Sequence, residues 1–158
     1  MTATTEPLEL NSDERELIEL EVASLLPALE GHRRERYQAL AEAVAGGVVP
    51  PDLVPQLESL LELVLQTARA RKLYRAEGER ILTGLLHRTP RGHELSSQLN
   101  DINKALKAIT GHTLNGARVG MRTLGHFTVT LQTDAATLTL AVRPDSLNVE
   151  SVAVGERS

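Results

Sequence analysis

The chain of 158 residues is long enough for one good hydrophobic core or two small domains, and its 41% hydrophobic content is ordinary for a folded protein. It contains no cysteine, which excludes disulfides, iron–sulfur clusters, cysteine-ligated zinc and thiol nucleophiles. Its aromatic residues are Tyr37, Tyr74 and Phe127, a supply that disfavours stacking surfaces for single-stranded nucleic acids.

The absence of cysteine fits a reducing compartment, and we expect a cytoplasmic location. The first ten residues carry Glu6 and Glu9 and have neither a basic cluster nor an apolar stretch, so no signal peptide is expected. Charges such as Glu62 interrupt the longest apolar runs, so no membrane span and no membrane partner are expected.

The net charge of −4 hides a segregation of charge along the chain. Residues 1–68 carry 13 acidic and 4 basic side chains, whereas residues 69–93 carry 7 basic and 2 acidic ones. Residues 94–158 carry 6 of each sign. The basic segment therefore needs an acidic partner, either within this chain or outside it.

Residues 1–11 are expected to form a flexible N-terminus. Asn11 followed by Glu14 resembles an N-cap arrangement, which predicts a helix that starts near Ser12. Pro27 should kink or end this helix.

Two or three further helical stretches are expected before residue 89. Gly31 should stop the first helix, and a second helix should cover about residues 33–45. A third should begin near Asp52, a plausible cap. Residues 56–77 contain no helix breaker, so we expect either one long helix or two helices joined near Gly78.

The clearest pattern lies after a predicted boundary at residues 89–92. Residues 94–109 form an amphipathic helix with an apolar seam of Leu95, Leu99, Ile102, Leu106 and Ile109. Residues 115–116 are a turn signal, and Glu150 is the expected position of a β-bulge. Period-two alternation predicts short strands around residues 119–121, 127–132 and 137–142, and a last one from Leu147.

These patterns together predict the α+β class. The N-terminal helical subdomain should hold three to four helices over residues 12–89. The C-terminal subdomain, residues 93–154, should be a helix packed on a three- to four-stranded antiparallel β-meander, because the connections are too short for parallel crossovers.

No pattern in the sequence indicates catalysis, so we expect no catalytic residue, metal or cofactor, and no small-molecule substrate is identified. The histidines are scattered and lack metal-ligand spacing; they are His32, His87, His93, His112 and His126. No nucleophile elbow and no phosphate-binding glycine loop occur. An enzyme would require a pocket that gathers histidines and carboxylates from distant segments.

One constellation indicates a binding function, and we call it the basic stripe. If residues 69–88 are helical, four cations lie opposite the apolar face, and two more extend the charge; they are Arg69, Lys72, Arg75 and Arg80, then Arg88 and Arg91. Clustered arginine suits an acidic protein or a phosphate backbone. The alternative is a solvated face that the acidic N-terminal helices of the same chain neutralise.

Two weaker candidates remain. The polar face of the sheet could bind a ligand or another strand, although threonine is also a good exposed strand former; its residues are Arg118, Arg122, Thr128, Thr130, Gln132, Thr137 and Thr139. The seam of the 94–109 helix is adequate either for a dimer interface or for packing on the meander.

We therefore predict a small intracellular, non-enzymatic binding or scaffold protein. It is expected to form a homodimer through apolar helix faces and to contact an acidic partner through the basic stripe. The alternative is a nucleic-acid-binding protein that uses the same residues 69–91 on the phosphate backbone.

Overall fold

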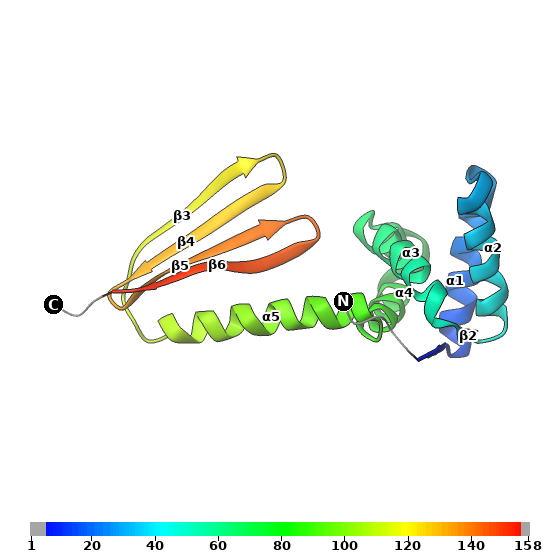
Figure 1. Cartoon of the computed structure of the whole chain (residues 1–158), viewed down its shortest axis with the longest axis horizontal. Helices are drawn as coiled ribbons and strands as arrows, with labels where there is room; N and C mark the ends of the chain where they lie inside the picture. Colours follow the sequence, from blue (N-terminus) through cyan, green and yellow to red (C-terminus); the bar gives the residue numbers. More distant parts are fainter. Residues whose placement is uncertain (1–5, 156–158) are drawn as a thin grey trace. The chain divides into compact units, whose positions relative to one another are not determined.

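The computed structural model describes residues 6–155 and divides into two compact units, a helical unit (Met1–His93) and a sheet unit (Glu94–Ser158). The helical unit contains β1 (Leu8–Glu9), α1 (Ser12–Leu25), the 3₁₀ helix η1 (Leu26–Ala28), α2 (Gly31–Ala45), β2 (Val48–Val49), the 3₁₀ helix η2 (Pro51–Leu53), α3 (Val54–Gln66) and α4 (Arg69–His87). The sheet unit contains α5 (Pro90–Ile109), β3 (Leu114–Thr123), β4 (His126–Thr133), β5 (Ala136–Arg143) and β6 (Ser146–Val154), although the first turn of α5 belongs to the helical unit (Figure 1). This architecture confirms the predicted α+β class.

The start of α1 is as the sequence predicts. The Asn11 side chain accepts a hydrogen bond from the Glu14 backbone N–H at 2.9 Å, and the Glu14 carboxylate accepts one from the Asn11 N–H at 3.0 Å. This capping box satisfies two backbone donors that would otherwise be unpaired. Pro27 lies in η1, so the helix ends where expected.

Two expectations for the N-terminal half differ from the structure. Residues 1–5 of the expected flexible N-terminus lie outside the described residues, but β1 pairs antiparallel with β2, and Leu10 is buried in the core. Gly31 does not stop a helix; it is the first residue of α2 and has a φ of 57°. Glycine adopts this left-handed conformation without a steric penalty, which lets the chain reverse direction between α1 and α2.

One long helix, the first alternative for the third helical stretch, is wrong, whereas the second alternative, a junction near Gly78, corresponds to a kink at Arg75. α3 ends at Gln66, Ala68 follows with a left-handed φ of 56°, and α4 is itself kinked at Arg75, whose φ is 61°. Gly78 lies within α4, where a Cβ atom would approach the Tyr74 Cβ at 2.1 Å. This glycine therefore allows a close approach and does not join two helices.

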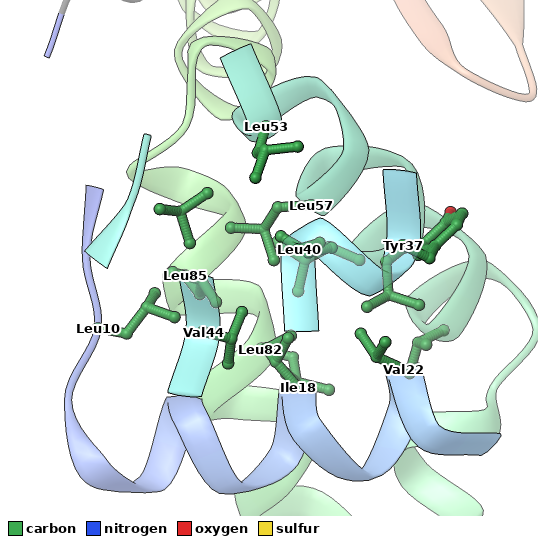
Figure 2. Packing of buried hydrophobic residues seen from close by; sticks show 14 of the residues in the cluster. Leu10, Ile18, Val22, Tyr37, Leu40, Val44, Leu53, Leu57, Leu82 and Leu85 are labelled. Carbon is green, nitrogen blue, oxygen red and sulfur yellow. The ribbon is translucent and has the colours of Figure 1, made fainter. Parts of the chain in front are cut away.

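The helices of the helical unit enclose one hydrophobic core (Figure 2). Its members come from α1, α2, β2, η2, α3, α4 and the segments that connect them, and they include Leu10, Ile18, Val22, Tyr37, Leu40, Val44, Leu53, Leu57, Leu82 and Leu85. Each fully buried Leu or Ile side chain contributes about 1.5–3 kcal/mol by leaving water. The buried residues of α1, α2 and α3 recur mostly at intervals of three or four positions, so each of these helices packs one face inward.

The residue cluster predicted as a boundary is the start of α5. Pro90 is the first residue of α5, where its missing N–H costs nothing, and the buried Thr89 hydroxyl accepts a hydrogen bond from the Gly92 N–H at 3.2 Å. The hydroxyl thereby caps the first turn. The division between the two units falls just beyond this turn, between His93 and Glu94.

The sheet is an antiparallel meander in the order β3-β4-β5-β6. The predicted bulge is confirmed: Leu140 pairs with Val149 and Thr139 with Ser151, so Glu150 is the extra residue. The turn predicted at Asn115–Gly116 is wrong, because both residues lie inside β3, next to an irregularity in its register with β4.

The seam of α5 packs on one face of this sheet. Ile102 is buried against Leu138 and Leu140, and the outer seam residues Leu106 and Ile109 pack around them. The side-chain oxygen of Gln98 accepts a hydrogen bond from the Leu147 backbone N–H at 3.2 Å. The seam therefore serves mainly as the core of the sheet unit.

The left-handed conformation of Ala68 predicts an unusual response to glycine. Ala68→Gly should raise the free energy of unfolding by about 1 kcal/mol, because the Cβ penalty of this conformation disappears. Ala23→Gly, in the exposed part of α1, should instead lower it by about 0.5–1 kcal/mol. Urea unfolding of both variants measures the difference, and two changes of the same sign would contradict this explanation.

Candidate functional site

Arg69, the first residue of the predicted basic stripe, pairs with α1. Its Nε donates to the Glu21 carboxylate at 2.7 Å and its Nη2 donates to the Ser24 hydroxyl at 2.8 Å. Glu21 is only 3% exposed and also accepts a hydrogen bond from the Tyr74 hydroxyl. Burial, together with this bond, raises the pKa of Tyr74 to about 12, and the carboxylate also raises the pKa of Arg69. Arg69 thus neutralises a buried charge inside the chain.

Arg88 follows α4 and also pairs with α1. Its Nη2 lies 2.6 Å from both carboxylate oxygens of Glu14, and its Nη1 donates to the Glu9 carbonyl at 3.0 Å. Glu14 is the same residue that closes the capping box of α1. One guanidinium therefore connects the end of α4 to the start of α1 and to β1.

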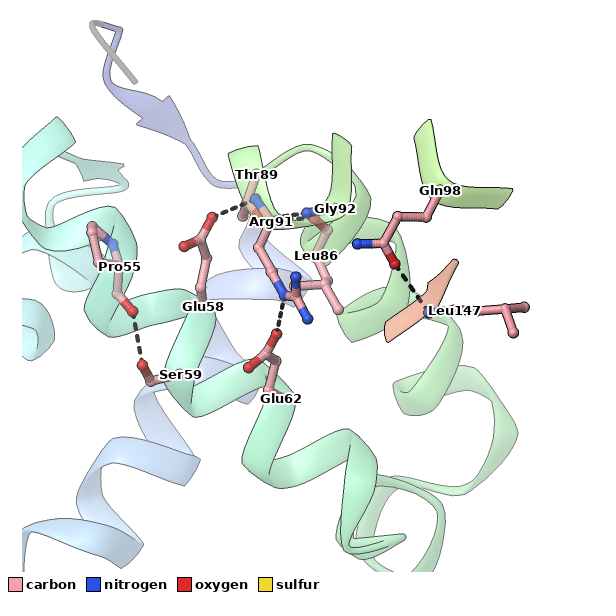
Figure 3. A network of polar contacts seen from close by, with 10 residues as sticks. All are labelled: Pro55, Glu58, Ser59, Glu62, Leu86, Thr89, Arg91, Gly92, Gln98 and Leu147. Carbon is pink, nitrogen blue, oxygen red and sulfur yellow. Dashed lines mark hydrogen bonds and ion pairs between the residues drawn. The ribbon is translucent and has the colours of Figure 1, made fainter. Parts of the chain in front are cut away.

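Arg91 pairs with α3 (Figure 3). Its backbone N–H donates to the Glu58 carboxylate at 2.8 Å, and its Nε donates to the Glu62 carboxylate at 2.7 Å. The acidic residues of α3 thus hold the first turn of α5. One fifth of the Arg91 side chain is accessible, which is less than for Arg69, Arg80 and Arg88, the other paired cations of the stripe.

The remaining cations of the stripe lie on the outside of α4. Arg80 binds Glu77 one turn away, with Nη2 at 2.6 Å from the carboxylate, which lowers the pKa of Glu77. Lys72 and Arg75 are exposed, and neither forms an ion pair with any residue in the part of the chain that the structure describes. Because α4 is kinked at Arg75, no continuous helix face presents all of these cations.

The structure therefore separates the residues that the sequence groups together. Arg69, Arg88 and Arg91 connect helices of the helical unit, whereas Lys72 and Arg75 remain open to solvent.

Within residues 6–155, no group of three or more histidine or carboxylate side chains could hold a metal ion. In the same part of the chain, none of the helices combines the length and apolar character that crossing a bilayer requires.

A second surface lies on the sheet, and the sequence analysis missed it. Val119 and Met121 of β3 are 67% and 60% exposed, and Phe127 of β4 is 40% exposed. Met121 pairs with Phe127 across the strands, and Val119 pairs with Val129, which packs in the core with α5. These side chains share the face that α5 covers, since cross-strand partners point to the same side. We call Val119, Met121 and Phe127 the apolar strip.

The apolar strip is open because one helix cannot cover four strands. A helix with its side chains is about 10–12 Å wide, whereas adjacent strands are about 4.8 Å apart. α5 covers mainly β5 and the neighbouring parts of β4 and β6, where Leu138 and Leu140 are buried. The sequence did contain a signal for this open surface: it predicts several strands with an apolar face but only one helix that could cover them.

The polar face of the sheet carries the threonines that the sequence analysis identified. Thr128, Thr130 and Thr139 are half-buried, and Arg122 of β3 forms an ion pair with Glu150 at the bulge of β6. One of the two arginines of the polar face is therefore neutralised by a carboxylate of the same sheet. This pairing leaves less charge on the polar face for a ligand.

Comparisons with known proteins add no assignment: no family model matches the chain, and searches of curated proteins and of solved structures found no match either.

The pairing of Arg88 predicts a loss of stability on truncation. Arg88→Ala leaves the buried Glu14 carboxylate without its cation and should lower the free energy of unfolding by about 1–3 kcal/mol. Lys72→Ala, which removes an exposed cation, should change it by less than about 0.5 kcal/mol. Urea unfolding distinguishes the two variants. Equal effects would show that Arg88 has no structural role.

The raised pKa of Tyr74 predicts a specific loss of stability at alkaline pH. The unfolded chain releases this proton near pH 10, about the ordinary value, whereas the folded chain holds it to about pH 12. The contribution of Tyr74 is therefore complete below about pH 10 and disappears as the pH rises to about 12. Between these values the wild type should lose stability more steeply than Tyr74→Phe in urea unfolding; parallel curves would contradict the assignment.

Proposed function

We propose that this chain is a small, non-enzymatic binding or scaffold protein that self-associates through its sheet unit. The observation that supports this most directly is the apolar strip of Val119, Met121 and Phe127. A contiguous apolar surface left open on a folded unit is typical of a protein–protein contact site. Scattered single apolar side chains would not support the same conclusion.

The proposed interface differs from the helix faces considered from sequence. The α5 seam is largely used inside the sheet unit, where Ile102 is buried and Leu106 and Ile109 are partly buried. Leu99 is the member of the seam that stays about half exposed. Self-association is therefore better supported on the sheet than on the α5 seam.

Contact with an acidic protein remains a weaker part of the proposal. Lys72 and Arg75 are the open cations of the stripe, and two charges support only a limited, salt-sensitive contact. Nucleic-acid binding is supported less, because proteins on a phosphate backbone commonly use about 6–10 such contacts. The cysteine-free composition supports a reducing location such as the cytoplasm.

Self-association through the apolar strip is tested by introducing a charge. The wild type should have the mass of a dimer at micromolar concentration in light scattering, and Val119→Asp should have the mass of a monomer, because the interface would bury an unpaired carboxylate. Leu124→Asp is the matched control, since Leu124 is 92% exposed in a turn outside the strip. A monomeric wild type, or a Val119→Asp variant that remains dimeric, would reject the proposed interface.

A further inference from the structure

The strand that carries most of the apolar strip is also an edge of the sheet. β3 pairs with β4 on one side, and no described segment pairs with its other side. An exposed edge strand presents a row of unpaired N–H and C=O groups, and natural proteins usually protect such edges with bulges or charges. β6, at the opposite edge, has a bulge at Glu150 near its centre. β3 is regular from Gly116 to Met121, and its register with β4 shifts only at either end of that segment.

We propose that β3 pairs antiparallel with β3 of a second copy of this chain, with Val119 opposite Val119 on the two-fold axis. This inference rests on the proposed self-association and specifies its geometry. The backbone groups of both edges then satisfy each other, and the sheets of the two copies become continuous. The two apolar strips lie side by side on the face that α5 occupies.

The register of this pairing follows from the alternation of apolar and polar side chains along β3. A two-fold axis perpendicular to the sheet keeps the apolar faces of both copies on the same side of the joined sheet. Residues directly opposite each other then point to the same face, so the axis must lie between one residue and the same residue of the second copy. An axis at Arg118 places two arginines directly opposite each other, and an axis at Gly120 places Arg118 opposite Arg122. Like charges directly opposite each other destabilise a strand pair.

An axis at Ala117 is excluded by polarity. It would place Val119 opposite Asn115 and Met121 opposite Thr113, so apolar side chains would face polar ones. It would also extend the pairing into the irregular segment between Leu114 and Gly116.

The axis at Val119 avoids each of these conflicts. Met121 lies opposite the small Ala117, so the apolar side chains of the two copies pair with each other. On the polar face, Arg118 lies opposite Gly120, and Arg122 lies opposite Gly116. Neither glycine carries a side chain that could oppose an arginine, and no two cations face each other. Among the axes at residues 117 to 120, only this one makes the strand complementary to itself, which is what an interface between identical copies requires.

The absence of cysteine in the chain allows a direct test with single-cysteine variants. Val119→Cys should form a covalent dimer under mild oxidation or with a short thiol cross-linker, because opposite Cβ atoms are about 4.5–5.5 Å apart. Ala117→Cys alone should not, since its copy is four residues away, about 14 Å along the strands. An equal mixture of Ala117→Cys and Met121→Cys should form the heterodimer. Val154→Cys, on the other edge strand, should remain uncrosslinked.

The outcomes separate this geometry from the proposed function. If the wild type has the mass of a dimer but Val154→Cys cross-links and Val119→Cys does not, the β3 pairing is wrong although self-association stands. If Ala117→Cys cross-links with Val119→Cys in preference to Met121→Cys, the register is wrong. A wild type with the mass of a monomer rejects both proposals. Only efficient cross-linking of Val119→Cys and of the mixed pair supports the inference.

Discussion

The helical unit depends on the neutralisation of two buried carboxylates of α1. Glu14 and Glu21 are almost inaccessible to water, and a buried carboxylate without a cation costs several kcal/mol. Arg88 and Arg69 supply the cations, so both arginines stabilise the packing of α1 against α4. This constraint explains the segregation of charge along the chain, because the acidic first 68 residues and the basic segment that follows fold against each other. Arg69 and Arg88, which look like parts of a binding surface in the sequence, therefore belong to the packing of the helical unit.

The sequence predicted those parts of the fold that local chemistry determines. The cap at Asn11, the apolar faces of the helices and the bulge at Glu150 depend on residues a few positions apart, so their patterns are visible in the chain. The break at Ala68 was not visible, because alanine is a strong helix former and does not signal a left-handed conformation. The dipeptide at residues 115–116 was misread for the converse reason: a local turn signal was overridden by pairing with β4.

The candidate site was harder to predict than the fold, because it depends on distant pairs. Arg69 lies 48 residues from Glu21, and Arg88 lies 74 residues from Glu14, so spacing along the chain carries no information about these contacts. The sequence left two alternatives for the basic stripe, an open face or one covered by acidic helices, and the structure places Arg69, Arg88 and Arg91 in the second class. Period-two alternation likewise identified the apolar face of each strand, but alternation does not report how much of that face one helix covers. The exposure of Val119 and Met121 could therefore not be predicted from this sequence pattern alone.

These two findings lead to one view of how the molecule could interact. Most of the arginine charge is used internally, so the electrostatic attraction left for a partner is small and would be screened by salt. The apolar strip and the free edge of β3 offer the opposite kind of contact, in which apolar side chains and backbone hydrogen bonds supply the free energy. Such a contact is directional, because the strand fixes the register, and it is insensitive to ionic strength. One helix cannot cover the apolar face of four strands, so part of that face and the edge of β3 stay open. An interface between identical copies would cover both with a single contact.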